Sequence, residues 1–519
     1  MHLLPSPPLR HPRGSIPLSR RRTAALPDDD AVLIAEGITP ALARKMGGFG
    51  NYAVSFSVIC VLAGGMTLFG FGLHNGGPAV MVWGWVGIFA MTLVLGACLG
   101  EVTSVYPTSG ALYHMAHRLG GPGWAWLTGW LNLLGLVGAI AGIDYGAASF
   151  IGAFASLQWG FEPTPENTMA IFVCVLFLHG LLNSFGVGLV DVLSKISVWW
   201  QAGGVTLIVG TLFLAPGERQ SPAFVFTEYY NDSGISNPLY GAGVGCLMAA
   251  YTFCGYDASA HMAEETTRAQ KAAPWGMVHA ILWSGVAGFV LIVGMLFAME
   301  SYAGTLDTAT GVPPAQIFID VLGIGMAKAL LVVVIVAQLF CGNAETAAAS
   351  RMAYAFSRNR ALPGWETWSR VNARTENPTA AVWLCVGIAL VLALPSLYSP
   401  TAYAAVTAIN VLGITPAYAI PVFLRLRAGD KFQQGPWNLG RFSKPMGYVA
   451  VTYVVVLTVF FCLPQAYPMT TQSFNYAPLT LVVVLLFAWI SWITTGRKHY
   501  AMPLPSSTAE DAVIAGGMV

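Results

Sequence analysis

The sequence predicts an all-α integral membrane protein with twelve transmembrane helices. Of its 519 residues, 55% are hydrophobic and only 9% are charged, whereas soluble domains carry about 25% charged residues. Uncharged stretches such as 277–299 and 477–495 are long enough to cross a hydrocarbon core, which takes about 20 helical residues. The net charge of +1 gives no reason to expect a nucleic-acid partner.

Twelve apolar segments follow one another along the chain. Their predicted bounds are 51–73, 79–100, 122–154, 168–190, 194–215, 240–258, 276–299, 326–348, 379–398, 403–424, 445–466 and 477–495. An even number of spans places both termini on one side of the membrane. Of the 25 Lys and Arg residues, all but Arg219 and Lys328 fall on that side, which predicts cytoplasmic termini.

The expected organisation is one membrane domain, 51–498, between two cytoplasmic tails, 1–50 and 499–519. The first tail is rich in proline and contains charge runs at 20–22 and 28–30, so we expect it to be mostly disordered. The eight cysteines fall within the predicted spans and lack metal-ligand spacing, so we expect neither a disulfide framework nor a metal site.

Glycines interrupt the first and sixth spans. Gly64 and Gly65 lie near the middle of span 1, and Gly255 is similarly placed in span 6. Close packing of helices is the simpler explanation for any single glycine. However, the first and sixth spans are equivalent in two five-helix halves that run in opposite directions, and paired interruptions of this kind indicate an inverted-repeat transporter with its site at the breaks.

A helix break at membrane depth frees backbone N–H and C=O groups that lipid cannot satisfy. The N-terminal end of a half-helix suits a carboxylate, and unwound carbonyls suit an ammonium group or a cation. Because an amino acid carries both groups, the pattern favours an amino acid or a related small amine as substrate.

Four segments carry distinctive strings, namely GGMTLFGFGL in span 1, EVTSVYPTSGALYHMA at 101–116, YTFCGYDASAHMAEET at 251–266 and SRMAYAFSRNRALP at 350–363. They resemble the amino acid–polyamine–organocation (APC) superfamily permeases, and within them the amino acid/choline branch that includes GABA and choline permeases. The resemblance covers nearly all of 42–495. It implies a LeuT-like fold, with helices 1–5 and 6–10 as inverted repeats and helices 11 and 12 outside them.

The resemblance implies a secondary transporter, a plasma-membrane permease for amino acids or related amines such as GABA, working by alternating access as a symporter in most relatives. Two alternatives stay open, a choline or polyamine transporter of the same fold and a nutrient sensor that binds without transport. No loop carries a nucleophile–base motif, so we do not expect an enzyme. The lipid bilayer and a small substrate are the expected partners, and a proton or sodium ion, rather than a cofactor, is expected to drive transport.

The resemblance also places a substrate site at the two breaks. The backbone N–H groups expected to hold the substrate carboxylate belong to Ala63, Gly64, Gly65, Met66 and Thr67. The segment expected to meet the amine through its carbonyls consists of Tyr251, Thr252, Cys254 and Gly255. Phe253 is expected to form an aromatic gate over the substrate. The loop that closes the cytoplasmic side in relatives matches Tyr106, Pro107 and Gly110.

Glu345 is the charged residue that most requires a functional explanation, because an uncompensated carboxylate is costly at membrane depth. Together with Thr346, it is expected near the inner ends of helices 1 and 8. There it either carries the coupling proton or binds a cationic substrate. The alternative is an ion pair with Arg351 near the cytoplasmic interface.

Four further polar residues each support a functional and a structural interpretation. Asp257 is expected to cap backbone N–H groups freed by the break. Asp144 either contacts the amine at the outer vestibule or is an interfacial carboxylate. Glu101 either gates with Tyr106 or is simply solvated. Gln201 lies nearest the position where some proton-coupled relatives carry a lysine, and since glutamine does not titrate, it does not supply proton coupling.

Overall fold

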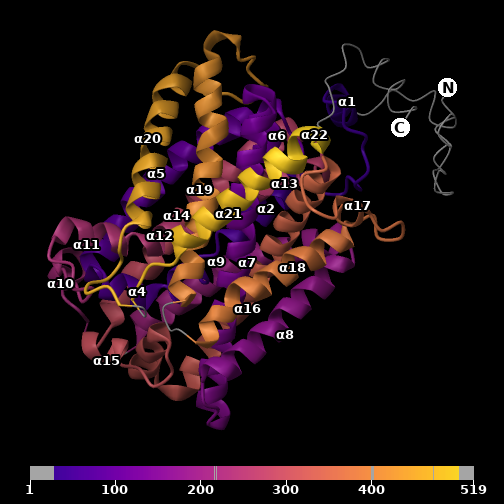
Figure 1. Cartoon of the computed structure of the whole chain (residues 1–519). Helices are drawn as coiled ribbons and strands as arrows, with labels where there is room; N and C mark the ends of the chain where they lie inside the picture. Colours follow the sequence, from indigo (N-terminus) through magenta and orange to yellow (C-terminus); the bar gives the residue numbers. More distant parts are fainter. Residues whose placement is uncertain (1–27, 216, 218, 399–401, 471–472, 502–519) are drawn as a thin grey trace, which may run out of the picture.

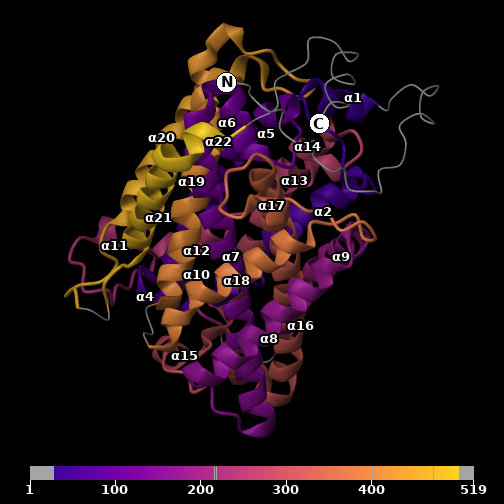
Figure 2. The ribbon, with the colours of Figure 1, turned by 45° about the vertical axis from the view of Figure 1, so that its right-hand side comes forward.

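The computed structural model describes residues 28–215, 217, 219–398, 402–470 and 473–501. Over these residues the chain is helical, and its β-pairing is limited to three isolated bridges. Most helices run side by side along one axis (Figure 1). The first and last described helices, α1 (Asp28–Ala35) and α22 (Arg497–His499), lie at the same end of the bundle in Figures 1 and 2. We call this the termini end, and α15 (Tyr302–Leu306) marks the opposite end.

Ten helices of the described chain are long and apolar enough to cross a membrane. They are α5 (Gly77–Val105), α7 (Pro122–Trp159), α8 (Pro165–Ser184), α9 (Val187–Leu214), α14 (Ala269–Ala298), α16 (Pro313–Arg358), α18 (Thr379–Ala393), α19 (Ala402–Ala428), α20 (Ser443–Cys462) and α21 (Ala477–Ser491). The boundary between the fourth and fifth predicted spans was placed too late, since α8 ends at Ser184 and α9 begins at Val187.

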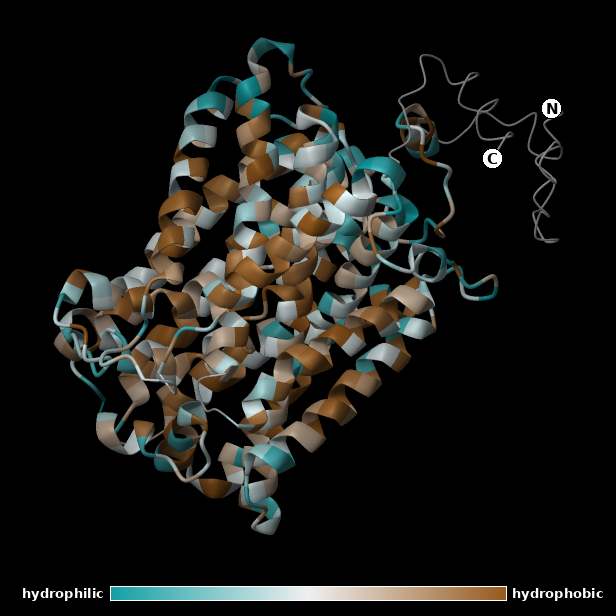
Figure 3. Cartoon of the chain, in the orientation of Figure 1, coloured by the Kyte–Doolittle hydropathy of each residue, from teal (hydrophilic) through white to brown (hydrophobic). Residues whose placement is uncertain are grey.

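The outside of the bundle is apolar. Trp83, Phe177, Trp199, Phe213 and Trp489 are each more than half exposed. Brown, apolar residues dominate the middle of the bundle, and teal, polar residues gather towards its two ends (Figure 3). Such a surface suits a hydrocarbon environment rather than water.

The first predicted span is interrupted. It consists of α2 (Gly48–Val58), a non-helical segment at 59–63, α3 (Gly64–Thr67) and α4 (Phe69–His74). The break therefore precedes the glycine pair, which begins the second half-helix instead of interrupting the first. A Cβ atom added at Gly64 would lie 2.5 Å from Oγ1 of Thr252, so the absence of a side chain lets the two interrupted helices touch.

The sixth predicted span is interrupted where expected. It runs through α11 (Pro238–Gly245), α12 (Leu247–Thr252), a break at 253–257, and α13 (Ala258–His261), and it ends in the 3₁₀ helix η2 (Ala263–Glu265). Gly255 has φ +88°, a left-handed conformation that glycine adopts without steric cost. The prediction of a break at Gly255 is confirmed.

The interior of the bundle is formed by α7 and α19. In their apolar membrane-length windows, 89% of the residues of α7 and 83% of those of α19 are buried, against 28% in α20 and 11% in α21. The last two helices therefore lie on the outside of the bundle, and Figure 2 shows both at its left-hand side in orange and yellow.

The expectation of a mostly disordered tail is wrong for residues 28–50. Residues 1–27 and 502–519 of the two expected tails lie outside the described residues. Oδ2 and Oδ1 of Asp29 accept the N–H groups of Arg268 (2.7 Å) and Ala269 (3.1 Å) at the start of α14, and Arg44 donates to the carbonyl of Thr266 (2.6 Å). An apolar side chain of α1, Leu33, is buried as well. Helix capping and burial thus order a segment whose sequence resembles a charged tail.

Candidate functional site

A small cavity lies where the two interrupted helices meet. Its volume is about 20 Å³, enough for about one water molecule. Its walls are formed by Val58, Cys60, Ala63 and Gly64 from the first break, Tyr251, Thr252, Cys254 and Gly255 from the second, Ala139 and Ile143 of α7, Cys341 and Glu345 of α16, and Asn410 of α19. At this volume the cavity is too small to hold an amino acid.

Six of the ten residues expected at the substrate site line this cavity, namely Ala63, Gly64, Tyr251, Thr252, Cys254 and Gly255. Gly65, Met66, Thr67 and Phe253 do not. In the first break, the N–H groups of Ala63 and Gly64 both donate to the carbonyl of Cys60, at 2.9 Å each. The segment is therefore held in a tight turn whose last residues begin α3.

Phe253 does not occupy the gate position expected of it. Its ring packs against Trp85 (centroids 4.7 Å apart) and Phe89 (5.8 Å) on α5, away from the cavity. Tyr251 presents its ring to the cavity instead. A Cβ atom added at Gly142 of α7 would lie 2.6 Å from the Tyr251 hydroxyl, so glycine makes room for this ring.

Glu345 lies in the cavity wall at the level of the breaks, and not at the inner ends of the helices as expected. Its side chain is fully buried, and neither carboxylate oxygen has a hydrogen-bond partner among the described residues. A Cβ atom added at Gly255 would lie 3.4 Å from its Oε2. The alternative ion pair is wrong, because Arg351 Nε pairs with Oε1 of Glu265 (2.9 Å). Thr346 is buried beside Glu345 but does not line the cavity.

Asp257 serves the second break indirectly. It makes no side-chain cap at the start of α13, which corrects the expectation. The freed N–H of Gly255 donates to the Tyr418 hydroxyl (2.9 Å), and that hydroxyl donates to Oδ1 of Asp257 (2.7 Å). Asn132 Nδ2 and His261 Nε2 lie 3.3 and 3.1 Å from Oδ2. The break is therefore held by a relay through α19.

Asp144 lies neither at an interface nor in an outer vestibule, so both expected positions are wrong. It is fully buried, with Oδ2 3.0 Å from Nδ1 of His179 on α8. Gln201, also buried, donates to Ser197 Oγ (3.0 Å) and to the carbonyl of Phe56 (3.4 Å), and it thereby ties α9 to α2 just before the first break.

Glu101 is neither solvated nor in contact with Tyr106. Only 1% of its side chain is exposed; Oε2 pairs with Nε of Arg425 (3.2 Å), and Oε1 accepts the N–H of Leu439 (3.2 Å). Its Oε2 also accepts the hydroxyl of Ser443. Glu101 therefore joins α5 to the connection between α19 and α20.

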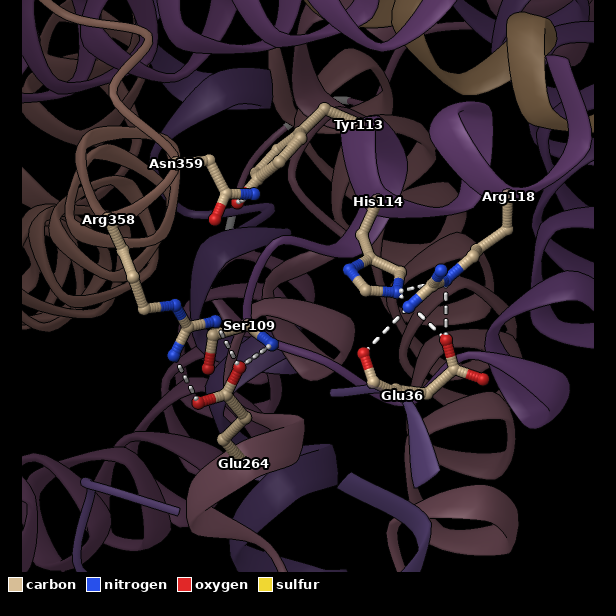
Figure 4. A network of polar contacts seen from close by, with 8 residues as sticks. All are labelled: Glu36, Ser109, Tyr113, His114, Arg118, Glu264, Arg358 and Asn359. Carbon is tan, nitrogen blue, oxygen red and sulfur yellow. Dashed lines mark hydrogen bonds and ion pairs between the residues drawn. The ribbon is translucent and has the colours of Figure 1, made fainter. Parts of the chain in front are cut away.

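Partly buried ion pairs lie at the termini end of the site (Figure 4). Glu264 accepts two hydrogen bonds from the Arg358 guanidinium (3.0 and 3.2 Å) and one from the N–H of Ser109 (3.0 Å). Burial raises the pKa of Glu264, but the Arg358 charge and the hydrogen bonds from Arg358 and Ser109 outweigh it, so the pKa lies below its ordinary value. Ser109 belongs to the loop that carries Tyr106, Pro107 and Gly110, so that loop takes part in these contacts.

A second contact anchors α6 (Ala111–Gly120), the helix that follows this loop, to the segment after α1. Glu36 Oε2 accepts from Nε of Arg118 (2.6 Å) and lies 3.2 Å from Nε2 of His114 (Figure 4). Burial raises the pKa of Glu36, but the hydrogen bond with His114 and the Arg118 charge lower it below its ordinary value.

Stacked aromatic rings and two long hydrogen bonds lie towards the opposite end of the cavity. The Tyr403 hydroxyl donates to the carbonyl of Gly142 (3.2 Å), and the rings of Tyr403 and Tyr145 stack with centroids 5.3 Å apart. Gln338 Nε2 lies 3.4 Å from Oγ1 of Thr67. A larger cavity of about 360 Å³, lined by residues that include His74 and Asp232, lies at this end. Separate sets of contacts thus lie towards the two ends of the central cavity.

Sequence reasoning missed several residues of the site. Cys60, Cys341 and the α7 residues give no polar signal, so nothing in the sequence marks them as cavity lining. Asn410 does give a polar signal, because it is a polar residue within an apolar helix. Its Nδ2 donates to the carbonyl of Gly135 (2.9 Å), and its Oδ1 has no partner among the described residues.

The chain is similar in sequence to known proteins along most of its length. Residues 45–487 match the profile of the amino acid permease family. The chain is 36% identical to amino-acid permease BAT1 of Arabidopsis thaliana, over 90% of this chain and 95% of that protein. The homolog of this permease in Oryza sativa subsp. japonica is also 36% identical, over 90% and 94%. The GABA-specific permease of Saccharomyces cerevisiae is 28% identical, over 95% and 89%.

Proposed function

The chain belongs to the amino acid permease family and is a multi-pass membrane transporter of amino acids, and we propose that it works by alternating access around the central cavity. A small cavity between two interrupted helices, with separate contacts towards its two ends, carries this proposal. Opening one set of contacts at a time lets the substrate enter from one side and leave on the other.

The architecture we propose is LeuT-like, with twelve spans. Ten helices of membrane-spanning length in the described chain and the two interrupted spans supply that number. The interrupted helices come first and sixth, as an inverted repeat of two five-helix halves requires. The peripheral positions of α20 and α21 support their assignment as helices 11 and 12, outside the repeats.

We place the protein in the plasma membrane with its termini end in the cytoplasm. The distribution of Lys and Arg supports this orientation, because basic residues collect on the cytoplasmic side of membrane proteins. The ion pairs of Figure 4 are then the cytoplasmic seal, and the Tyr403 contacts are the external seal.

Glu345 is the residue that we assign to the ammonium group of the substrate. An ionised carboxylate buried without a partner costs several kcal/mol, and the charges that act on Glu345 from within the protein, those of Asp144 and Asp257, are also negative. A substrate ammonium group provides the missing counter-charge. The start of α3, where Ala63 and Gly64 line the cavity, is the proposed place of the substrate carboxylate, which would replace the carbonyl of Cys60 as the acceptor for their N–H groups.

The substrate is therefore an amino acid, or a related amine such as GABA, that presents an ammonium group to Glu345. The name of the yeast relative supports GABA as a candidate. Transport is driven by a proton, and sodium is the alternative coupling ion.

Uptake into proteoliposomes tests the proposal. One labelled amino acid should be taken up and should exchange with unlabelled substrate, and neutral, acidic and basic amino acids, GABA, choline and a polyamine should be compared as competitors. Competition by compounds that carry both an ammonium group and a carboxylate is the expected result. Binding without any uptake or exchange would identify a sensor, and competition by choline or the polyamine alone would contradict the amino acid assignment.

A further inference from the structure

Asp144 and His179 form a buried pair with unused hydrogen-bonding capacity. Both side chains are fully buried, and Oδ2 of Asp144 lies 3.0 Å from Nδ1 of His179. The other atoms of the pair, Oδ1 of Asp144 and Nε2 of His179, have no hydrogen-bond partner in the described part of the chain. Buried polar groups are usually satisfied, so two free atoms in one pair call for an explanation.

The pair lies directly behind the cavity wall. A Cβ atom added at Gly342 of α16 would lie 2.0 Å from Oδ1 of Asp144 and 2.6 Å from Cε1 of His179. The neighbours of Gly342 and Asp144 in the chain, Cys341 and Ile143, both line the cavity. Glu345 follows Gly342 by about one helical turn and is therefore on the same side of α16.

The charge state of the Asp144–His179 pair and the charge state of Glu345 influence each other. The charge of Asp144 acts on Glu345 with the same sign. When Asp144 and Glu345 are both ionised, two buried anions lie beside the cavity and repel each other. The substrate ammonium group neutralises Glu345, and a proton on the Asp144–His179 pair neutralises the second charge. Binding of substrate and binding of a proton should therefore favour each other.

Among the described residues, basic side chains on the elements around the pair are engaged elsewhere. Arg351 and Arg358 of α16 pair with Glu265 and Glu264, Lys328 of α16 donates to Gln158, and Arg118 of α6 pairs with Glu36. Titratable residues on the elements that pack against α7 and α8 include Glu345 and Cys341 of α16, Cys385 of α18, Tyr403 of α19, and Asp191 and Lys195 of α9. Lys195 is paired with Asp191 (2.6 Å) and is 40% exposed, so it does not neutralise the buried pair.

A second Asp–His pair in the same protein provides a contrast. Asp257 and His261 lie 3.1 Å apart and are equally buried. However, Tyr418 and Asn132 occupy the remaining positions around Asp257, and the carbonyl of Ser109 lies 3.0 Å from Nδ1 of His261. This pair is fully satisfied as part of the scaffold, whereas the Asp144–His179 pair is not.

We propose that the Asp144–His179 pair is the proton-binding site that couples substrate transport to the proton gradient. This inference rests on the proposed transport function and adds to it the site that carries the driving ion. One proton enters from the external side, binds to the pair as the substrate ammonium group binds to Glu345, and leaves to the cytoplasm after the substrate. No other bond forms or breaks. Glu345 holds the ammonium group in the loaded state, so the proton that travels with the substrate is assigned to the pair.

The test compares wild type, His179→Gln, Asp144→Asn and the control His279→Gln, a histidine of α14 outside this site, in proteoliposomes. Exchange of labelled for unlabelled substrate is measured at equal pH on both sides. Accumulation is measured with an inward gradient of one pH unit, which supports at most about tenfold accumulation per proton. We expect accumulation in wild type and His279→Gln, and exchange without accumulation in His179→Gln and Asp144→Asn.

Accumulation by His179→Gln equal to that of wild type would overturn the proposal, as would a wild type that exchanges substrate but ignores the gradient. A wild type that neither exchanges nor accumulates substrate contradicts the transport function instead. If the variants lose exchange, proton uptake on substrate binding is measured with a pH indicator in weakly buffered detergent solution. Wild type should take up about one more proton per bound substrate than variants that bind substrate; equal uptake in both contradicts the assignment.

Discussion

Replacement of Glu345 by glutamine should separate substrate binding from stability. The substitution keeps the shape of the side chain and removes its charge. In the substrate-free protein the carboxylate has no hydrogen-bond partner among the described residues, so its removal breaks no contact. The melting temperature should therefore be unchanged or higher, because the variant no longer buries an unpaired acidic group.

The same substitution should weaken substrate binding. If Glu345 holds the ammonium group, the variant leaves that cation buried without its counter-charge, which costs about 2–5 kcal/mol. Since each 1.4 kcal/mol corresponds to a factor of ten, substrate affinity should fall by about 30-fold or more.

The assay is substrate exchange in proteoliposomes over a range of concentrations, together with thermal unfolding in detergent. Thr346→Val is the matched control, because Thr346 is the next residue, is equally buried and does not line the cavity. An unchanged KM for Glu345→Gln would refute the assignment of the ammonium group to this residue. A lower melting temperature would show that Glu345 has a structural partner.

Three further substitutions probe the scaffold around the cavity. Tyr418→Phe breaks the relay that satisfies the second helix break and should destabilise the protein by about 1–3 kcal/mol. Tyr256→Phe should not, because the neighbouring Tyr256 hydroxyl has no hydrogen-bond partner among the described residues. Equal losses in thermal unfolding would refute the relay. Gly64→Ala should abolish substrate exchange, because its Cβ would lie 2.5 Å from Thr252 in the second interrupted helix. Gly65→Ala should retain exchange, because the nearest atom to its Cβ is 4.0 Å away. Exchange by Gly64→Ala but not by Gly65→Ala would contradict this packing. Glu264 has a lowered pKa, so its stabilisation is complete above its unfolded pKa of about 4.3 and is lost as pH falls through the lower folded value. Glu264→Gln should therefore lower the melting temperature by the same amount at every pH from about 5.5 to 7.5. A difference between the melting temperatures of wild type and variant that changed with pH in this range would contradict the assignment of the ion pair.

Local backbone geometry was the most predictable part of the fold. The break at Gly255 could be predicted because a left-handed residue inside an apolar span requires glycine. The break in the first span was placed too late, since Gly64 is required for a close approach to Thr252 and not for the break itself. Sequence patterns do not distinguish these two uses of glycine.

Side-chain partners could not be predicted, because they come from distant parts of the chain. Glu345 could be singled out as a carboxylate in an apolar helix, but the absence of a partner depends on Arg351 turning to Glu265 instead. Asp144 and His179 are 35 residues apart on two helices, and Tyr418 lies 161 residues from Asp257. These pairings depend on how the helices pack, which no local pattern encodes.

Protection of a cavity cysteine by substrate tests the central claim most directly. Cys254 lines the cavity, and Cys174 on α8 is exposed on the outside of the bundle. The rate of alkylation by a membrane-permeant maleimide is measured for each cysteine, with the other seven cysteines replaced by serine or alanine, in a variant that still exchanges substrate.

If the cavity is the transport site, a saturating concentration of a transported amino acid should slow the alkylation of Cys254 and leave that of Cys174 unchanged. Alkylation of Cys254 at the same rate with and without a saturating, transported substrate would contradict the assignment of the substrate to this cavity.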